Sequence, residues 1–187
     1  IRAAHAFEFH DRHTELTWLE IPILHALFKF QDFAQTLSPF TGEQGFTKAY
    51  SPTLLCLLDF IERLCGILLR PDGEVWFTGL VPKSIEHQAT TFDTGYARRI
   101  DGHDYELYNT PERTVGYKDG AKLFSAPAGV RVVTDRAGNL CKLVGVQANG
   151  VRGTLRFGPA AYDIQISANE QQTLTKDGFV AVTAPGL

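Results

Sequence analysis

Apolar side chains recur at helical spacing in the first part of the chain. Between residues 14 and 37 their intervals lie closer to 3.6 than to 2, which is typical of one face of an α-helix. The positions are Leu16, Leu19, Ile23, Leu24, Leu27, Phe28, Phe30, Phe33, Ala34 and Leu37. Pro22 has no backbone N–H to donate, so it marks either a break or the first turn of the main helix. The pattern predicts one helix or two over this stretch.

A second helix is predicted at about 52–65. Ser51 can cap the free amides, Pro52 suits the first helical position and Gly66 suits a left-handed exit. Most of its side chains are apolar, and mainly Asp59, Glu62 and Arg63 are left to face water. So wide an apolar stripe belongs to a helix that is covered on most of its circumference.

The two helical stretches therefore offer broad apolar faces, and the sequence supplies no third helix to bury them. Either the rest of the chain or another polypeptide covers these faces. We favour another polypeptide, a larger helical chain or an upstream part of the same precursor. The chain begins at Ile1 and contains no Met, which also suggests a processed subunit or a fragment.

From Arg70 onward the pattern changes to short apolar runs bounded by Gly, Pro, Asn and Asp. Strands are expected at Glu74–Phe77, Tyr105–Tyr108, Val130–Val133, Leu140–Val146, Thr154–Phe157, Tyr162–Ile166 and Phe179–Thr183. Turn signals such as Asp119-Gly120 and Ala137-Gly138-Asn139 separate them. Short strands with such turns indicate an antiparallel β-sandwich. We therefore expect a helical segment at 1–69 and a β-sandwich domain at 70–187.

Composition and charge restrict the function. A net charge of −3 gives no basic excess for nucleic-acid binding. The longest apolar run contains Asp59, Glu62 and Arg63 and is too polar to span a bilayer. The three cysteines, Cys56, Cys65 and Cys141, form no CxxC pair and are expected to be buried thiols, which slightly favours a soluble cytoplasmic chain. Neither a cofactor nor a metal site is expected.

One stretch carries a family resemblance. Ser38-Pro39-Phe40-Thr41-Gly42-Glu43, followed by the helix end Cys65-Gly66-Ile67, is similar in order and spacing to the (α/α)6-barrel glycoside hydrolases of the processing α-glucosidase and mannosylglycerate hydrolase type. The likeness covers about 40 residues. It implies an α+β fold, in which a partial (α/α)6-barrel helical segment, the last helices of the barrel, precedes the antiparallel β-sandwich.

The resemblance also implies where the chemistry would lie. Such enzymes place a general base four residues before the loop proline, and that position is Gln35 here. Because an amide cannot accept a proton from water, three explanations stay open. The alignment is shifted and Glu43 or Asp32 is the working carboxylate, or the chain is an engineered Glu-to-Gln variant, or hydrolysis has been lost. The candidate catalytic residues are therefore Glu43 and Gln35, and the general acid would lie upstream of Ile1.

Two functions follow as expectations. The first is the carboxy-terminal portion or small subunit of a glycoside hydrolase that acts on a glycoside or oligosaccharide, with inversion at the sugar carbon. The alternative is a non-catalytic carbohydrate-binding or structural subunit whose β domain docks on a partner. Aromatic residues in the β half could hold sugars, but core packing is the preferred interpretation for them. They are Trp76, Phe92, Tyr96, Tyr105, Tyr108, Tyr117 and Tyr162.

Overall fold

The computed structural model describes residues 66–79, 93–147 and 149–182 continuously, and before them only seven positions between 52 and 63. Those seven, which all have helical backbone conformation, are Pro52, Leu54, Leu55, Leu58, Asp59, Glu62 and Arg63. The chain divides into two compact units, 1–61 and 62–187, and every strand described belongs to the second. The helix expected over 14–37 lies outside the described residues.

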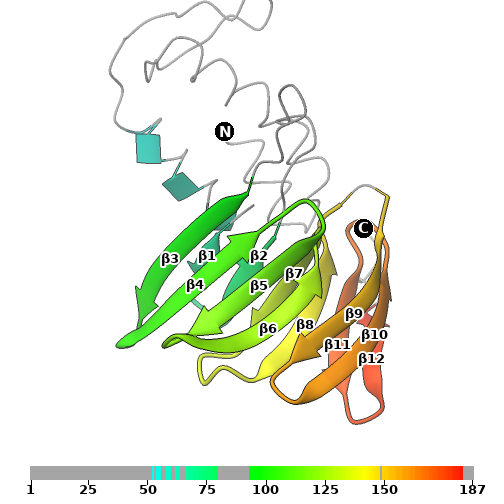
Figure 1. Ribbon diagram of the computed structural model, residues 1–187. Helices are drawn as coiled ribbons and strands as arrows, with labels where there is room; N and C mark the ends of the chain where they lie inside the picture. The colour runs from blue at the N-terminus through cyan, green and yellow to red at the C-terminus, as the bar shows by residue number, and fades with distance from the viewer. Residues whose placement is uncertain are drawn as a thin grey trace, which may run out of the picture. The chain divides into compact units, whose positions relative to one another are not determined.

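The second unit contains two antiparallel sheets (Figure 1). The first sheet contains, in spatial order, β1 (Ile67–Leu69), β2 (Val75–Thr78), β7 (Val130–Thr134), β8 (Leu140–Gly145), β11 (Gln171–Thr175) and β12 (Gly178–Val182). Every neighbouring pair in it is antiparallel. Antiparallel order permits the short hairpins that join β1 to β2, β7 to β8 and β11 to β12.

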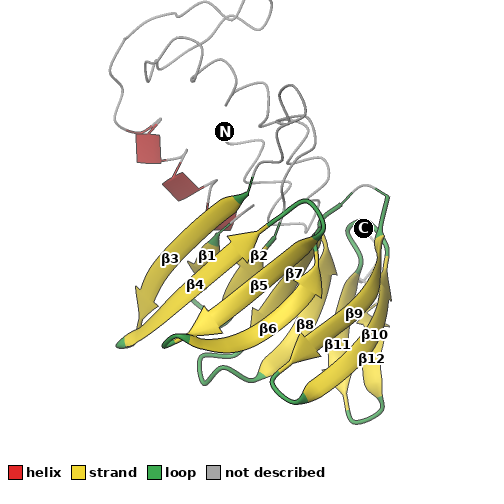
Figure 2. Ribbon diagram, viewed as in Figure 1, coloured by secondary structure: helices red, strands yellow, loops and turns green. Residues whose placement is uncertain are grey.

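The second sheet lies in front of the first in Figure 1. Its strands, in spatial order, are β10 (Ala160–Ile166), β9 (Val151–Phe157), β6 (Ala121–Pro127), β5 (Arg113–Lys118), β4 (His103–Asn109) and β3 (Thr94–Ile100). All of its pairings are antiparallel as well. Figure 2 shows that strands and short loops make up almost all of the part of this unit that the structure describes.

The core lies between the two sheets and takes apolar side chains from both. Phe77 of the first sheet is fully buried, and its ring centroid lies 5.8 Å from Tyr105 and 5.4 Å from Phe124 of the second sheet. Leu107 and Leu155 are also completely buried there. Alternation along each strand sends these residues inward and their sequence neighbours outward.

Hairpin geometry explains why two Asp-Gly pairs stand at strand ends. Asp119 and Gly120 have φ angles of 51° and 76°, and Asp101 and Gly102 have 52° and 84°. Two successive positive φ angles are the signature of a type I′ turn, for which Asp-Gly is a preferred pair. The turn predicted at Asp119-Gly120 is thus confirmed between β5 and β6.

The outward side of the first sheet has a buried arginine. Arg131 has no exposed surface, and its Nε donates to Thr78 Oγ1 at 2.8 Å while Nη2 donates to the Arg63 carbonyl at 3.0 Å. Its guanidinium also lies 3.9 Å from the ring centroid of Trp76, a cation–π contact. This side chain therefore joins β7 and β2 to the residues that precede β1.

The fold class expected from the sequence is wrong. Within the described residues the regular structure is nearly all antiparallel strand in two sheets, and no (α/α)6-barrel segment lies among them. The expected boundary at residue 69 put Ile67–Leu69 in the helical segment, but this run is a strand, since so short an apolar run fits a buried strand as well as a helix end. Here it pairs with Val75–Phe77 across a turn that contains Gly73 at φ 90°.

Candidate functional site

The solvent-facing side of the second sheet is the candidate site, and we call it the open face. Its side chains alternate with the core residues along each strand, as the exposure of β4 illustrates: Tyr105 and Leu107 are buried, whereas Tyr108 is 50% exposed. The register places Gly95, Tyr108, Val115 and Ser125 in one row across four strands. A half-exposed tyrosine ring among outward side chains that are mostly polar or small is the feature that marks this face.

Tyr108 is held in one position by its neighbours. Its hydroxyl donates to Glu106 Oε2 at 2.8 Å, two residues earlier on the same face. A Cβ added to Gly95, its partner on β3, would lie 3.5 Å from the Tyr108 ring, so the ring lies over the glycine. Tyr117 packs edge-to-face against it, with ring centroids 5.9 Å apart and planes at 86°. The arrangement presents a fixed aromatic surface to solvent.

The electrostatics of Tyr108 and Glu106 determine which of the two donates and which accepts the hydrogen bond. The hydrogen bond to Glu106, and then the negative charge of that carboxylate, raise the pKa of Tyr108 above its ordinary value. Tyr108 therefore stays a neutral donor at physiological pH, with Glu106 as its acceptor. An aromatic ring beside a carboxylate that retains free lone pairs can stack on an apolar surface and accept hydrogen bonds from hydroxyl groups.

Basic side chains extend the open face toward β9. Arg113 Nη1 donates to Ser125 Oγ at 3.2 Å, and Ser125 is paired with Arg156 across β6 and β9. Farther along β9, Arg152 is paired with Gln165 of β10. Thr154 and Asp163 lie between these positions and are joined by a 3.0 Å hydrogen bond.

Gln35 and Glu43, the catalytic candidates from the sequence, lie outside the described residues, as does Asp32. The structure therefore leaves their roles as predictions. Cys56 and Cys65 are likewise not described. Cys141 is only partly buried, and that burial is the main reason its pKa is raised.

The aromatic residues divide into two groups. Core packing is confirmed for Trp76 and Tyr105, which are buried, and Tyr96 and Tyr162 pack in part against the core. It is wrong for Tyr108, which the strand turns to solvent, and Tyr117 lies beside it on the same side of the sheet. Phe92 lies outside the described residues. Alternation from Tyr105 was the signal that could have found it, because residues three apart on a strand point to opposite faces.

Other chemistry is sparse in the part of the chain that the structure describes. Its residues include no group of three or more His, Cys, Asp and Glu side chains placed to hold a metal ion. No helix among them is long and apolar enough to cross a membrane. His103 Nδ1 lies 2.7 Å from Asp119 Oδ2, an exposed pair at a hairpin end.

Comparison with models of known families, with curated proteins and with solved structures finds no match to this chain.

Proposed function

We propose that the two-sheet unit is a non-catalytic carbohydrate-binding module whose ligand stacks on Tyr108. One observation carries the proposal: a half-exposed tyrosine ring lies over a glycine, and its hydroxyl is anchored to the neighbouring carboxylate of Glu106. Sugars combine an apolar ring face with equatorial hydroxyl groups. Recognition of them calls for a flat aromatic surface bordered by fixed hydrogen-bonding groups.

The rigidity of the surface supports binding. Tyr108 is confined by Gly95 below, by Tyr117 at its edge and by Glu106 at its hydroxyl. A side chain that is already held in place loses little conformational entropy when a ligand arrives. A sheet also places such groups more precisely than a loop. The surroundings disfavour a purely apolar protein partner, because most other side chains of the open face are charged or carry hydroxyl groups.

Glycoside hydrolysis stays a prediction. It rests on the resemblance of the stretch from residue 35 to residue 67, and it assigns the general base to Gln35 or Glu43. Comparing Gln35→Glu and Glu43→Gln against a panel of glycosides tests it. Activity gained in the first variant would support a base at position 35, and unchanged activity in the second would remove Glu43.

The expected polypeptide partner also stays a proposal. Leu54, Leu55 and Leu58 are 38%, 64% and 50% exposed, so three large apolar side chains within ten residues face solvent. Exposed apolar surface of this kind supports a covering chain. Native mass spectrometry of source material tests the proposal. A co-purifying chain would support it, whereas a monomer with a cooperative thermal transition would contradict it.

Affinity electrophoresis tests the binding function directly. The full chain is run through native gels that contain one soluble polysaccharide each, covering neutral glucans, mannans, xylans and galactans as well as acidic polymers. We expect one or more of these polymers to retard the chain, and free oligosaccharide of the same type to relieve the retardation. Unchanged mobility in every gel would contradict the proposal.

A further inference from the structure

We propose that the ligand of the open face is an acidic oligosaccharide, and that a pocket at the ends of β9 and β10 binds one of its carboxylates through Arg152. This inference rests on the proposed carbohydrate-binding function and specifies its substrate class. Two observations support it: the open face has cations without an ion-pair partner among the described residues, and one of them, Arg152, lines a pocket.

The open face carries more cations than carboxylates, and several of its cations have no partner among the described residues. Lys122, Arg152 and Arg156 have neither an ion pair nor a side-chain hydrogen bond among the residues that the structure describes. Of the carboxylates, Glu106 accepts one hydrogen bond from Tyr108 and Asp163 accepts one from Thr154, and both keep their negative charge. Apart from the Arg99–Asp104 pair, four cations on this face outnumber its two carboxylates, so its net charge is positive although the whole chain carries −3. The four cations are Arg113, Lys122, Arg152 and Arg156.

These cations form a track that starts at the aromatic surface. Ser125 lies in the same row as Tyr108, accepts a hydrogen bond from Arg113, and is paired with Arg156 on the next strand. Arg152 lies on the same strand, four residues before Arg156. With strands about 4.8 Å apart and a rise of about 3.4 Å per residue, Tyr108 and Arg152 are separated by about 20 Å across the sheet. A single sugar cannot span that distance, so the ligand is an oligosaccharide.

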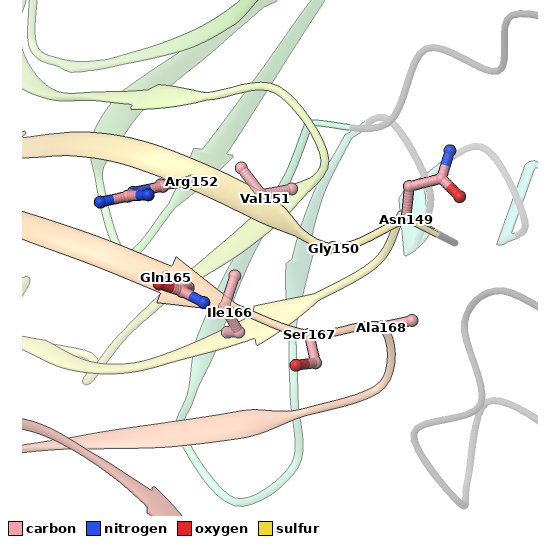
Figure 3. Close-up of a pocket in the computed structure, with 8 residues that line it drawn as sticks. All are labelled: Asn149, Gly150, Val151, Arg152, Gln165, Ile166, Ser167 and Ala168. Carbon is pink, nitrogen blue, oxygen red and sulfur yellow. The ribbon is translucent and has the colours of Figure 1, made fainter.

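The track ends at a pocket of about 550 Å³, shown in Figure 3. Arg152 and Gln165 line it from neighbouring strands, and Asn149 and Ser167 line it from the loops at the strand ends. Its volume is within the range of small-ligand sites, roughly 300–1,000 Å³. Arg152 is the one charged side chain among the described lining residues. An anion is the complementary ligand.

A nearby carboxylate does not cancel this charge. Glu170 lies in the turn that follows Ser167, where its Oε2 accepts from the Ser167 backbone N–H at 2.7 Å and its Oε1 accepts from Gln172 Nε2 at 2.8 Å. These donors hold the pKa of Glu170 below its ordinary value in spite of its partial burial. Glu170 keeps its negative charge but is held in the turn by these donors and forms no ion pair with Arg152, so Arg152 stays available to a ligand.

A carboxylated sugar fits this surface better than a nucleic acid does. The guanidinium fork of arginine matches a carboxylate with two parallel hydrogen bonds. The cations stand singly among amide and hydroxyl groups such as Gln165 and Thr154, which suits a chain with spaced charges and many hydroxyls. Nucleic-acid binding needs a continuous basic surface, and Glu106 and Asp163 interrupt this one.

The test compares acidic polymers with the same polymers after methyl esterification, which removes the charge and keeps the backbone. The probes are polygalacturonate, polymannuronate and hyaluronate, each in free-acid and esterified form, measured with the full chain at 150 mM NaCl. We expect one or more free acids to bind, with a loss of tenfold or more on esterification. Equal binding of both forms would overturn this inference and leave the proposed function standing, whereas binding of no neutral or acidic glycan would overturn both.

Matched variants locate the site. We expect the double variant Arg152→Gln/Arg156→Gln to bind the acidic polymer about tenfold more weakly or worse, since charge-assisted hydrogen bonds are lost. Arg99→Gln is the control, because Arg99 lies on the same face at β3 and is paired with Asp104. Equal affinity of the double variant and the unmodified chain would overturn the inference, as would an equal loss in Arg99→Gln. Single-stranded DNA bound as tightly as the polymer would overturn the glycan assignment.

Discussion

The Tyr108 hydroxyl donates a 2.8 Å hydrogen bond to Glu106 Oε2, and both side chains belong to the exposed side of β4. Deprotonation of Tyr108 would break this hydrogen bond and then place a phenolate against the carboxylate, which is why the pKa of Tyr108 is raised. We predict that Glu106→Gln lowers the pKa of Tyr108 toward the ordinary value of about 10. An NMR titration of ¹³C-labelled tyrosine measures it, and an unchanged titration in Glu106→Gln would contradict this relationship.

Two glycines beneath aromatic rings should respond in opposite ways to an added methyl group. A Cβ at Gly116 would overlap the buried Phe124 ring, whereas a Cβ at Gly95 would meet the Tyr108 ring at an ordinary 3.5 Å. We predict that Gly116→Ala lowers the free energy of unfolding by about 1–3 kcal/mol through overpacking. Gly95→Ala should change it by less than about 1 kcal/mol, in the stabilising direction, because alanine restricts the unfolded chain. Urea denaturation of both variants checks the contrast, and equal effects would refute it.

Arg131 should be a major contributor to stability. Arg131→Ala removes the donor to Thr78 and to the Arg63 carbonyl, and also the contact with the Trp76 ring. We predict a loss of about 3 kcal/mol in the free energy of unfolding, typical of a broken buried polar network. Arg70→Ala is the matched control, since Arg70 lies 4.5 Å from the same ring but its side chain is 29% exposed. A loss in the control as large as in Arg131→Ala would show that the burial of Arg131 is not what matters.

Acid should weaken the fold through carboxylates at the hairpin ends. Hydrogen bonds from the side chain and then the backbone of Asn139 lower the pKa of Asp135, and the hydrogen bond from Arg136 lowers that of Asp101. A lowered folded-state pKa contributes stability above the unfolded value of about 3.9, and this contribution is lost as pH falls through the folded value. We predict that the urea concentration at the midpoint of unfolding falls as the pH is lowered below 4, and that this fall is smaller in Asp101→Asn than in the unmodified chain. A midpoint independent of pH between 6 and 2.5 would contradict the prediction.

Most strands of the β half could be predicted because their inward positions are apolar. The expected run Val130–Val133 lies within β7 (Val130–Thr134), and Tyr105–Tyr108 lies within β4. β5 was missed for a physical reason. Its inward positions include Thr114 and Gly116, and the space left by the glycine is filled by Phe124 from β6, so no apolar run marks the strand.

The candidate site was harder to predict from the sequence than the strands were. Tyr108 could be placed on the outward side by alternation, but its contact with Gly95 depends on the register of β3 with β4. β3 has the sequence Thr-Gly-Tyr-Ala-Arg-Arg-Ile, with few apolar side chains. Its alternation therefore does not mark it as a strand, and its register with β4 could not be predicted. The cation track likewise needs the pairing of β6 with β9, which are distant in sequence.

The most direct test of the central claim is the dissociation constant of the full chain for the polysaccharide that retards it, measured for Tyr108→Ala and for Val180→Ala. Val180 is 52% exposed on β12 of the other sheet and controls for the loss of an exposed apolar side chain. We predict that Tyr108→Ala weakens binding tenfold or more, as expected for a central aromatic anchor, and that Val180→Ala binds like the unmodified chain. Unchanged affinity in Tyr108→Ala would contradict the assignment of the open face as the binding site.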